Sequence, residues 1–356
     1  MTDASTTTTT HSPGTALRRS VVYRRTGGPE VLEVVEREVP EPGPGEVRVR
    51  LERAGVNPTD WKSRRGAGGD DPVDPPQVPG QDGAGVVEAV GGGVEAAWHG
   101  VRVWVWETAY QRPEGTAQTV ALVPARRLVL LPDSASADLG ASLGVPFVTA
   151  HRCLTVGEHG PHRLGPGTLE GRTVLVAGGA GAVGNAAIQL ARWSDATVVA
   201  TVSSPAKAQL AAAAGADHVI DYTRRDVAEE VRRIVPAGVD TIVEVSPARN
   251  AALDAQVLAV GGSVAVYANN GGDDVTLPIR PLMLTNARVQ FVLLYTAPEE
   301  AKRHAVEDID AAVLDGAVRV GEGAGLPLHH FPLDRAHEAH AAVEAGAVGK
   351  VLIDLS

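Results

Sequence analysis

A group of glycines near the middle of the chain has the spacing of a dinucleotide-binding loop. Gly179, Gly181 and Gly184 match the pattern G-x-G-x-x-G, directly after the apolar run 173–177 and directly before a helical stretch at 185–193. In such loops the glycines allow a tight turn, close approach of the backbone to a pyrophosphate, and close packing of helix on strand. Free N–H groups at the helix N-terminus then hold the diphosphate. Because the strand and helix stand where the fingerprint requires them, the pattern predicts dinucleotide binding, with a purely structural turn as the alternative.

The residues that follow the next expected strand, 197–202, indicate which dinucleotide is bound. An NAD site usually has a carboxylate there to accept a hydrogen bond from the ribose 2′-hydroxyl, but this chain has Ser203, Ser204 and Lys207. Two hydroxyls and an ammonium would bind a 2′-phosphate, which a carboxylate would repel. The sequence therefore favours NADPH. The alternative is that a serine only caps the next helix and that Lys207 is a surface charge.

The hydrophobic pattern changes along the chain and indicates two kinds of sheet. Residues 20–53 form short apolar stretches between Gly- and Pro-rich turns, which predicts antiparallel strands. Beyond Pro132, continuous apolar runs alternate with helical stretches, which predicts a doubly wound parallel sheet covered on both faces. Its expected strands are 173–177, 197–202, 218–222, 241–245 and 263–267. The Pro- and Asp-rich stretch 66–79 is expected to be a surface loop without a regular element.

Composition narrows the class of protein. The chain has 356 residues, enough for two or three domains, and its net charge of −11 argues against a dedicated nucleic-acid binder. Its single cysteine, Cys153, excludes an internal disulfide and a zinc site built from several thiolates, and fits a reducing cytoplasm. We expect this thiol to be buried and unreactive.

Residues 1–17 have no signal-peptide pattern and are expected to form a disordered tail. The uncharged stretch 173–191 contains four glycines, so no membrane span is expected.

Several spaced motifs resemble the zinc-independent quinone oxidoreductase branch of the medium-chain dehydrogenase/reductase superfamily. They are the glycine loop, Gly55–Asp60 (GVNPTD), Gly80–Gly85 (GQDGAG) and Thr149–His151, and the similarity runs from about Arg18 to the C-terminus. The resemblance implies an α/β protein with a partly open, GroES-like β-barrel catalytic domain, interrupted by a Rossmann domain.

The domains implied are a tail at 1–17, a catalytic domain at 18–146 and 289–356, and an NADPH-binding domain at 147–288. The resemblance also implies a homodimer, for which 289–295 is the expected edge strand.

The same resemblance bears on metal binding. Zinc-dependent members of the superfamily carry Cys where Asn57 stands and His-Glu where Gln81-Asp82 stand, so no catalytic zinc is expected. Without a Lewis acid, hydride addition to a conjugated acceptor is easier than chemistry at an isolated carbonyl, because the developing charge is spread. The hypothesis is NADPH-dependent reduction of a quinone or of the activated C=C bond of an α,β-unsaturated carbonyl compound. The alternative is a non-catalytic NADPH-binding sensor or partner-binding protein.

The resemblance also assigns cofactor contacts. It places Gly181, Ala182 and Val183 on the pyrophosphate, and Ser203, Lys207 and Tyr222 on the 2′-phosphate, although Tyr222 has the alternative of an ordinary strand aromatic. At the nicotinamide end it places Thr149, Ser246, Tyr267, Asn269 and Asn270.

Four further residues are candidates for the substrate side. Asn57 can donate an N–H to a developing enolate or quinol oxygen. Lys62 stands where several quinone oxidoreductases have Tyr; it could stabilise an oxyanion, or donate a proton if burial lowered its pKa, or be a surface lysine. Trp106 and Tyr110 belong to a local aromatic cluster that could line the substrate cleft or fill the barrel core.

Overall fold

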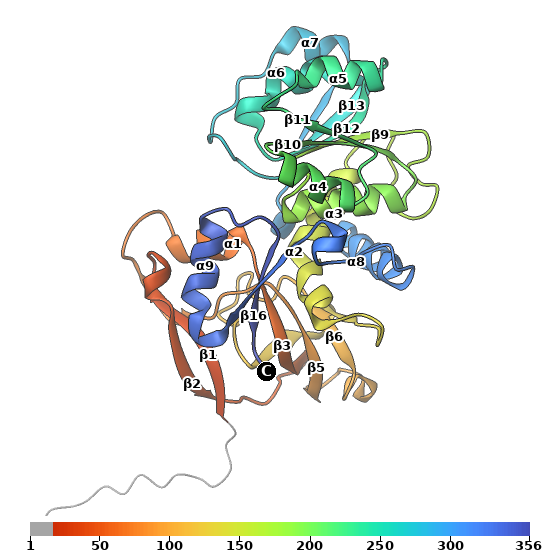
Figure 1. The fold of residues 1–356 in the computed structure, drawn as a ribbon. Helices are drawn as coiled ribbons and strands as arrows, with labels where there is room; N and C mark the ends of the chain where they lie inside the picture. The colour runs from red at the N-terminus through yellow and green to blue at the C-terminus, as the bar shows by residue number, and fades with distance from the viewer. Residues whose placement is uncertain (1–16) are drawn as a thin grey trace, which may run out of the picture.

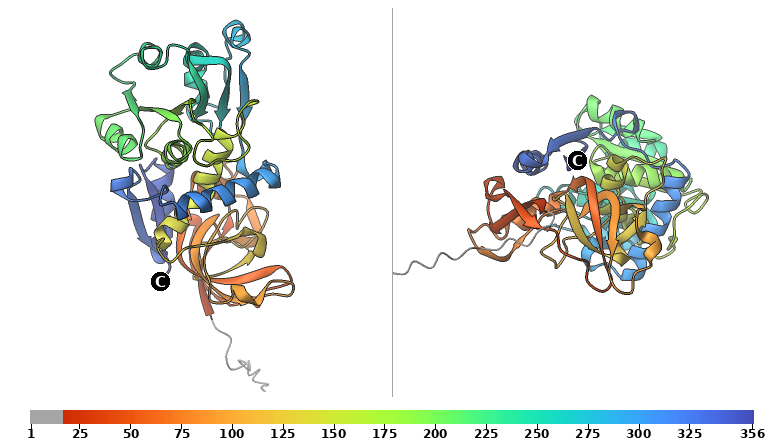
Figure 2. Two further views of the ribbon diagram at one scale, coloured as in Figure 1. Left: turned by 90° about the vertical axis from the view of Figure 1, so that its right-hand side faces the viewer. Right: turned by 90° about the horizontal axis from the view of Figure 1, so that it is seen from below.

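The computed structural model describes residues 17–356, which form two lobes. Helix α2 (Ala137–Leu154) runs from one lobe to the other (Figure 1). The predicted tail lies outside the described residues, apart from Leu17, which begins the first strand. Views from two further sides place the first and last strands in the same lower lobe (Figure 2). The predicted fold class is confirmed, since one lobe is a partly open barrel and the other is a Rossmann domain.

The lower lobe is built from two mostly antiparallel sheets. The smaller has the order β2-β1-β4 and the larger has the order β15-β16-β3-β5-β6-β8, with β7 paired to β3. Alternate residues of β3, such as Val47, Val49 and Leu51, are buried, as expected for strands that face a core on one side. The bounds are β1 (Leu17–Arg25), β2 (Glu33–Glu38), β3 (Glu46–Val56), β4 (Pro72–Gln77), β5 (Asp82–Val90), β6 (Arg102–Val105), β7 (Val120–Pro124), β8 (Leu128–Leu130), β15 (Leu328–Pro332) and β16 (Lys350–Asp354). Helices α1 (Pro58–Arg65) and α9 (Ala336–Glu344) lie against each other on this lobe.

Strand β4 contradicts the prediction of an irregular loop at 66–79. It pairs with β1 through Tyr23 opposite Gln77 and Arg25 opposite Pro72. Because β4 lies at the edge of its sheet, its outer side needs no backbone donors, and prolines are tolerated there. The proline content therefore indicated an edge strand rather than the absence of one.

The upper lobe is a parallel sheet of the order β11-β10-β9-β12-β13-β14. Its strands are β9 (Thr173–Ala177), β10 (Thr197–Val202), β11 (His218–Asp221), β12 (Val239–Glu244), β13 (Leu258–Val266) and β14 (Arg288–Phe291). The connecting helices are α3 (Ala182–Trp193), α4 (Pro205–Ala213), α5 (Val227–Ile234), α6 (Pro247–Val257) and α7 (Ile279–Leu284). The first two strands begin and end at the predicted residues, because both are apolar runs bounded by loop residues.

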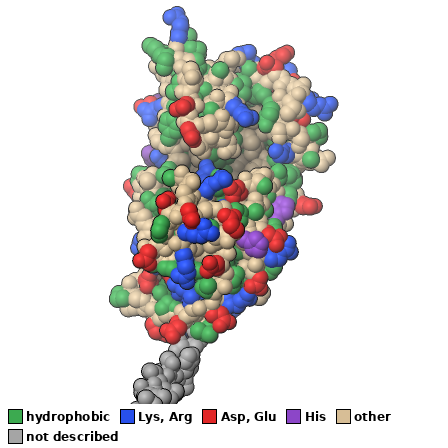
Figure 3. All heavy atoms as spheres, turned by 90° about the vertical axis from the view of Figure 1, so that its left-hand side faces the viewer, with side chains coloured by type: hydrophobic (Ala, Val, Ile, Leu, Met, Phe, Trp, Pro, Cys, Tyr) green, Lys and Arg blue, Asp and Glu red, His purple; other side chains and the backbone are tan. Residues whose placement is uncertain are grey.

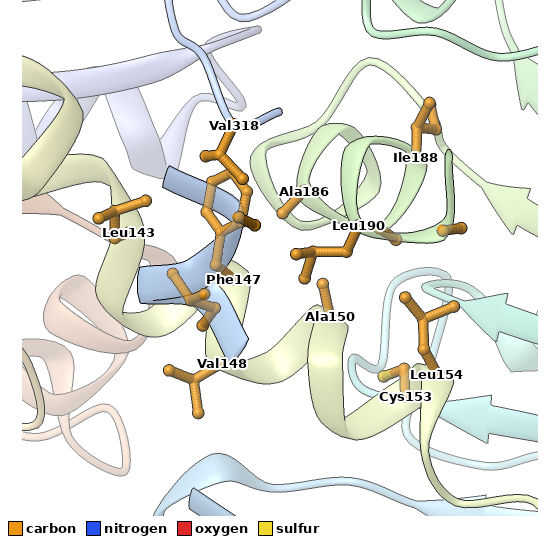
Figure 4. Packing of buried hydrophobic residues seen from close by; sticks show 14 of the residues in the cluster. Leu143, Phe147, Val148, Ala150, Cys153, Leu154, Ala186, Ile188, Leu190 and Val318 are labelled. Carbon is orange, nitrogen blue, oxygen red and sulfur yellow. The ribbon is translucent and has the colours of Figure 1, made fainter. Parts of the chain in front are cut away.

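The predicted domain boundaries differ from the structure at two points. The boundary after residue 288 is wrong, because β14 pairs in parallel with β13 and so belongs to the upper sheet. The boundary at 146/147 cuts through α2, which packs on strands of the lower lobe, on α3, and on α8 (Glu299–Leu314). Figure 4 shows Phe147 and Ala150 of α2 facing Ala186 and Leu190 of α3. One apolar core is therefore shared by both lobes.

The lone cysteine belongs to this shared core. Cys153 is fully buried on α2, and burial raises the pKa of its thiol to about 12. The expectation that it is buried is confirmed, and a thiol that stays protonated is a poor nucleophile. Within residues 17–356, no helix combines the length and apolarity that crossing a membrane demands.

Candidate active site

The glycine loop joins β9 to α3 with the backbone geometry that the fingerprint requires. Gly178 has φ +72°, a left-handed conformation that favours glycine, and a Cβ on Gly184 would lie 2.4 Å from the Gly178 carbonyl oxygen. Gly181 is the exposed N-cap of α3, and Ala182 and Val183 form its first turn, whose N–H groups lack partners within the helix. The loop can therefore accept an anionic group. Gly179 instead packs, since its Cβ would lie 2.9 Å from Ala200.

A hollow of ≈ 250 Å³ lies at the carboxyl ends of the parallel strands, next to this loop. Its wall contains six predicted cofactor residues: Gly181, Ser203, Lys207, Tyr222, Tyr267 and Asn270. The other lobe contributes residues 346–348, between α9 and β16, which the sequence did not indicate because they carry no polar side chain. Figure 3 shows the molecular surface hollowed between the lobes. We refer to this space as the nucleotide hollow.

One end of the nucleotide hollow carries the groups predicted to hold a 2′-phosphate. The Lys207 Nζ donates a hydrogen bond to Ser203 Oγ at 2.9 Å, and the side chain of Tyr222 is 53% exposed beside them. Ser204 has a different role, since its hydroxyl accepts from the Lys207 backbone N–H at 3.3 Å and caps α4. Lys207 and Ser203 therefore offer an ammonium and a hydroxyl to an anion. Ser204, by contrast, has the alternative role of a serine that caps the next helix.

A second hollow, of ≈ 530 Å³, adjoins the first, and Tyr267 lines both. We call it the acceptor hollow. Lys62 reaches it from α1 of the lower lobe and donates to Asn269 Oδ1 of the upper lobe at 3.1 Å. Lys62 is exposed, so it lacks the burial that a proton-donor role would require. Lys62 can still offer its positive charge to an oxygen of a substrate.

Asn57 lies deeper, in a buried polar cluster with Asp82 and Lys350. Its Nδ2 donates to Asp82 Oδ2 at 2.7 Å, and its Oδ1 accepts from Lys350 Nζ at 2.7 Å. Lys350 Nζ is also 3.4 Å from Asp82 Oδ2, and both side chains are fully buried. The Asn57 side chain is 2% exposed and lines neither hollow, so the predicted contact with a substrate oxygen is not seen and Asn57 instead belongs to the buried cluster. The sequence did not indicate Lys350, which lies 293 residues from Asn57 in the chain.

In this cluster, burial and the attraction between opposite charges shift the pKa values in opposite directions. Burial raises the pKa of Asp82 and lowers that of Lys350, while their mutual attraction opposes both shifts. Neighbouring Asp60 accepts from the Asn57 backbone N–H at 2.7 Å, and burial raises the pKa of its carboxyl to about 7. The cluster places one ammonium close to two buried carboxyl groups.

The remaining predicted residues take other positions. Trp106 is 3% exposed, and the guanidinium of Arg127 lies 4.1 Å from its ring centroid, so it belongs to the core rather than to either hollow. Tyr110 stacks on Tyr295 with ring centroids 4.7 Å apart. Thr149 is buried on α2. The Ser246 hydroxyl donates to the Asn270 carbonyl oxygen at 2.6 Å and fixes a loop at the nucleotide hollow.

No group of three or more His, Cys, Asp or Glu side chains in the described part of the chain is arranged to hold a metal ion. The positions where zinc-dependent relatives carry ligands are held by Asn57, Asp82 and Gln81, whose Oε1 accepts from the Ala109 N–H at 3.1 Å.

Sequence comparison assigns the family. Residues 43–133 match the alcohol dehydrogenase GroES-like domain, and residues 182–311 match the family described as zinc-binding dehydrogenase. The quinone oxidoreductase of Pongo abelii is 30% identical over 346 residues, covering 96% of this chain and 98% of that protein. The chain belongs to the quinone oxidoreductase branch of the medium-chain dehydrogenase/reductase superfamily. It is therefore similar over almost its whole length to known oxidoreductases.

Solved structures of family members share this fold. The Escherichia coli quinone oxidoreductase complexed with NADPH has a TM-score of 0.77 at 25% identity, covering 95% of this chain and all of that one. An NAD-dependent alcohol dehydrogenase has a TM-score of 0.78 at 30% identity, with the same coverage. One of these proteins is NAD-dependent and the other is complexed with NADPH, so the shared fold does not determine which nucleotide is preferred.

The buried cluster of this oxidoreductase yields a stability prediction. Replacing Lys350 by Met leaves Asp82 buried without its cation, and the loss of one partner of a buried pair costs about 3–5 kcal/mol. We expect the free energy of unfolding, measured in urea at neutral pH, to fall by about this amount. Lys62→Met, which removes an exposed ammonium, is the control and should change it by less than about 0.5 kcal/mol. Equal effects of the two substitutions would contradict a stabilising role for the cluster.

Proposed function

We propose that the protein is an NADPH-dependent, zinc-independent oxidoreductase that transfers a hydride to a quinone or to the activated C=C bond of an α,β-unsaturated carbonyl compound. The observation that carries the proposal is the continuity of the nucleotide hollow with the acceptor hollow, which share Tyr267. A hydride donor in the first hollow and an acceptor in the second would meet beside this residue. A volume of ≈ 530 Å³ is within the range of small-molecule sites.

NADPH is favoured over NADH by the groups at the end of β10. Ser203 and Lys207 stand there, and among the described residues that line the nucleotide hollow none is acidic. A 2′-phosphate carries up to two negative charges, so an ammonium with a hydroxyl stabilises it and a carboxylate would not. The glycine loop supplies the helix N-terminus for the diphosphate.

Bound NADPH supplies the hydride, and the protein positions the acceptor and holds its developing charge. Reduction of a quinone consumes one hydride and one proton from water and yields the hydroquinone. We assign Lys62 to the acceptor oxygen, because its ammonium reaches the acceptor hollow and its bond to Asn269 can be exchanged for one to a substrate. Asn57, which is 2% exposed and lines neither hollow, is assigned to holding the start of α1 and so the position of Lys62.

The position of Lys350 supports the proposal that the reaction needs no zinc. Its ammonium lies 2.7 Å from Asn57 and 3.4 Å from Asp82, so a cation of the protein already balances the carboxylate at this place. A second cation there would meet a like charge at close range. We infer that the carboxylate is not available as a metal ligand.

We further propose that the protein is cytoplasmic and forms a homodimer. The lone buried thiol is consistent with a reducing compartment. Strand β14 lies at the edge of the Rossmann sheet, and its last residue, Phe291, is 61% exposed, as is Leu293 just beyond it, at 58%. An edge with exposed apolar side chains favours pairing with a second copy of the same strand.

The activity is tested by following the loss of nicotinamide absorbance with a quinone, an enone and a simple ketone, each with and without a chelator. We expect turnover with the first two, little with the ketone, and no effect of the chelator. Lys62→Ala should lower kcat at least about tenfold, because it removes a donor to the developing oxyanion. Arg65→Ala, which removes an exposed cation of the same helix, is the matched control and should leave kcat unchanged.

Binding of NADPH without turnover of any acceptor would favour the sensor or partner-binding alternative. Alcohol oxidation that stops when the chelator is added would overturn the zinc-independent chemistry.

The nucleotide preference depends on Lys207. Lys207→Ala should raise the KM for NADPH by about 10- to 100-fold, because a charge-assisted hydrogen bond to the 2′-phosphate is lost. The KM for NADH should stay nearly the same, and Lys207→Arg, which keeps the charge, should retain most of the preference. An equal rise for both nucleotides would contradict this role.

The dimer is tested at Phe291. Phe291→Asp should place two carboxylates near the two-fold axis of paired β14 strands, and the protein should sediment as a monomer. Leu314→Asp alters an equally exposed leucine at the end of α8 and should leave the sedimentation coefficient unchanged. A wild-type protein that is monomeric at micromolar concentration would rule out the proposed pairing.

A further inference from the structure

A third hollow, of ≈ 220 Å³, lies beneath helix α6 and opens beside the phosphate end of the nucleotide hollow. The two share Gly178, Tyr222 and Val245 in their walls. Leu175 and Leu253 give the third hollow apolar sides, while its polar wall comes from β12 and α6. We call it the base hollow.

The polar wall is a network around one carboxylate. Glu244, at the end of β12, is completely buried; it accepts from the Ser246 backbone N–H, and its two oxygens accept from Asn250 Nδ2 at 3.0 and 3.2 Å. Asp254 lies one turn beyond Asn250 on α6 and is 4% exposed. Burial raises the pKa of both carboxyl groups, and the neighbouring charge of Glu244 raises that of Asp254 further, so Asp254 is the member of the pair that takes up a proton first and Glu244 is the one that stays a carboxylate.

This network fixes the orientation of the Asn250 amide. An ionised carboxylate only accepts hydrogen bonds, so the nitrogen of Asn250 must face Glu244 and the oxygen must face away from it. Among the residues that the structure describes, no donor is hydrogen-bonded to Asn250 Oδ1. The side chain lines the base hollow, and its Oδ1 is the polar atom that remains for a ligand there.

We propose that Asn250, oriented by Glu244 and Asp254, recognises the 6-amino group of the adenine of the bound dinucleotide. The base and the 2′-phosphate are attached to neighbouring carbons of one ribose, so the base must enter a hollow that adjoins Ser203 and Lys207. The base hollow meets this condition at Tyr222. A 6-keto purine would place its oxygen opposite Asn250 Oδ1, two acceptors without a proton between them. The proposal rests on the proposed NADPH site and adds to it a preference for the base.

The test compares the dissociation constants of NADPH and of its hypoxanthine analogue, in which an oxygen replaces the 6-amino group, by fluorescence titration of the full chain. Wild-type protein should bind NADPH about tenfold more tightly, the effect of one hydrogen bond. Asn250→Leu should bring this ratio close to one. Glu244→Gln should lower it as well, because a glutamine can donate to Asn250 Oδ1 and lets the amide turn.

Lys207→Ala is the control, since it should weaken both nucleotides by the same factor and leave the ratio unchanged. If Glu244→Gln fails to fold, Asn250→Leu still tests the proposal, because Asn250 is only half-buried on α6. A wild-type ratio of one, or a tenfold ratio retained in Asn250→Leu, would overturn the recognition of the base while NADPH-dependent quinone reduction persists. Failure of the wild-type protein to bind NADPH would overturn the proposed function together with this inference.

Discussion

One buried carboxylate ties together the elements on which the rest of the molecule is arranged. Asp82 begins β5, accepts from Asn57 at the start of α1, lies beside Lys350 at the start of β16, and accepts from the Val145 backbone N–H of α2 at 2.9 Å. The last contact lies next to Pro146, which has no N–H and interrupts the hydrogen bonds of the helix. Asp82 thus accepts a hydrogen bond from a backbone amide of α2 close to the interruption at Pro146. Gly144 leaves room for the Asp82 side chain, because a Cβ on Gly144 would lie 2.1 Å from Asp82 Oδ1.

Fixing α2 in this way has consequences in both lobes. The helix carries Phe147 and Ala150 into the upper lobe, where they pack on α3, the helix that follows the glycine loop. The same carboxylate holds the start of α1, which carries Lys62 to the acceptor hollow. The nucleotide loop and the candidate acceptor cation are therefore positioned from one place in the core. A domain boundary drawn within α2 therefore does not separate two independently packed cores.

The parts of the structure that could be predicted from sequence are those whose signal is local. Strands 173–177 and 197–202 are continuous apolar runs, and the glycine loop, Ser203 and Lys207 follow them at fixed spacing. Lys350 and residues 346–348 could not be found in this way, because the partner of Lys350 is nearly 300 residues away and residues 346–348 carry no polar side chain. Trp106 could not be assigned from its type, since a buried aromatic and a cleft-lining aromatic have the same pattern. Strand β4 was missed because proline excludes a central strand but permits an edge strand.

The distribution of cations limits the chemistry that this fold can perform. Lys350 is buried and its charge is balanced by Asp82, so it cannot move to an oxygen that becomes negative in a reaction. Lys62 is free to do so, but it is exposed, and water weakens the field of its ammonium compared with a metal ion in a dry site. Such a charge stabilises an oxygen that shares its electrons with a conjugated system better than it stabilises a localised alkoxide. This is the physical basis of the proposed preference for acceptors that spread the incoming charge themselves, which is the property that quinones and enones have in common.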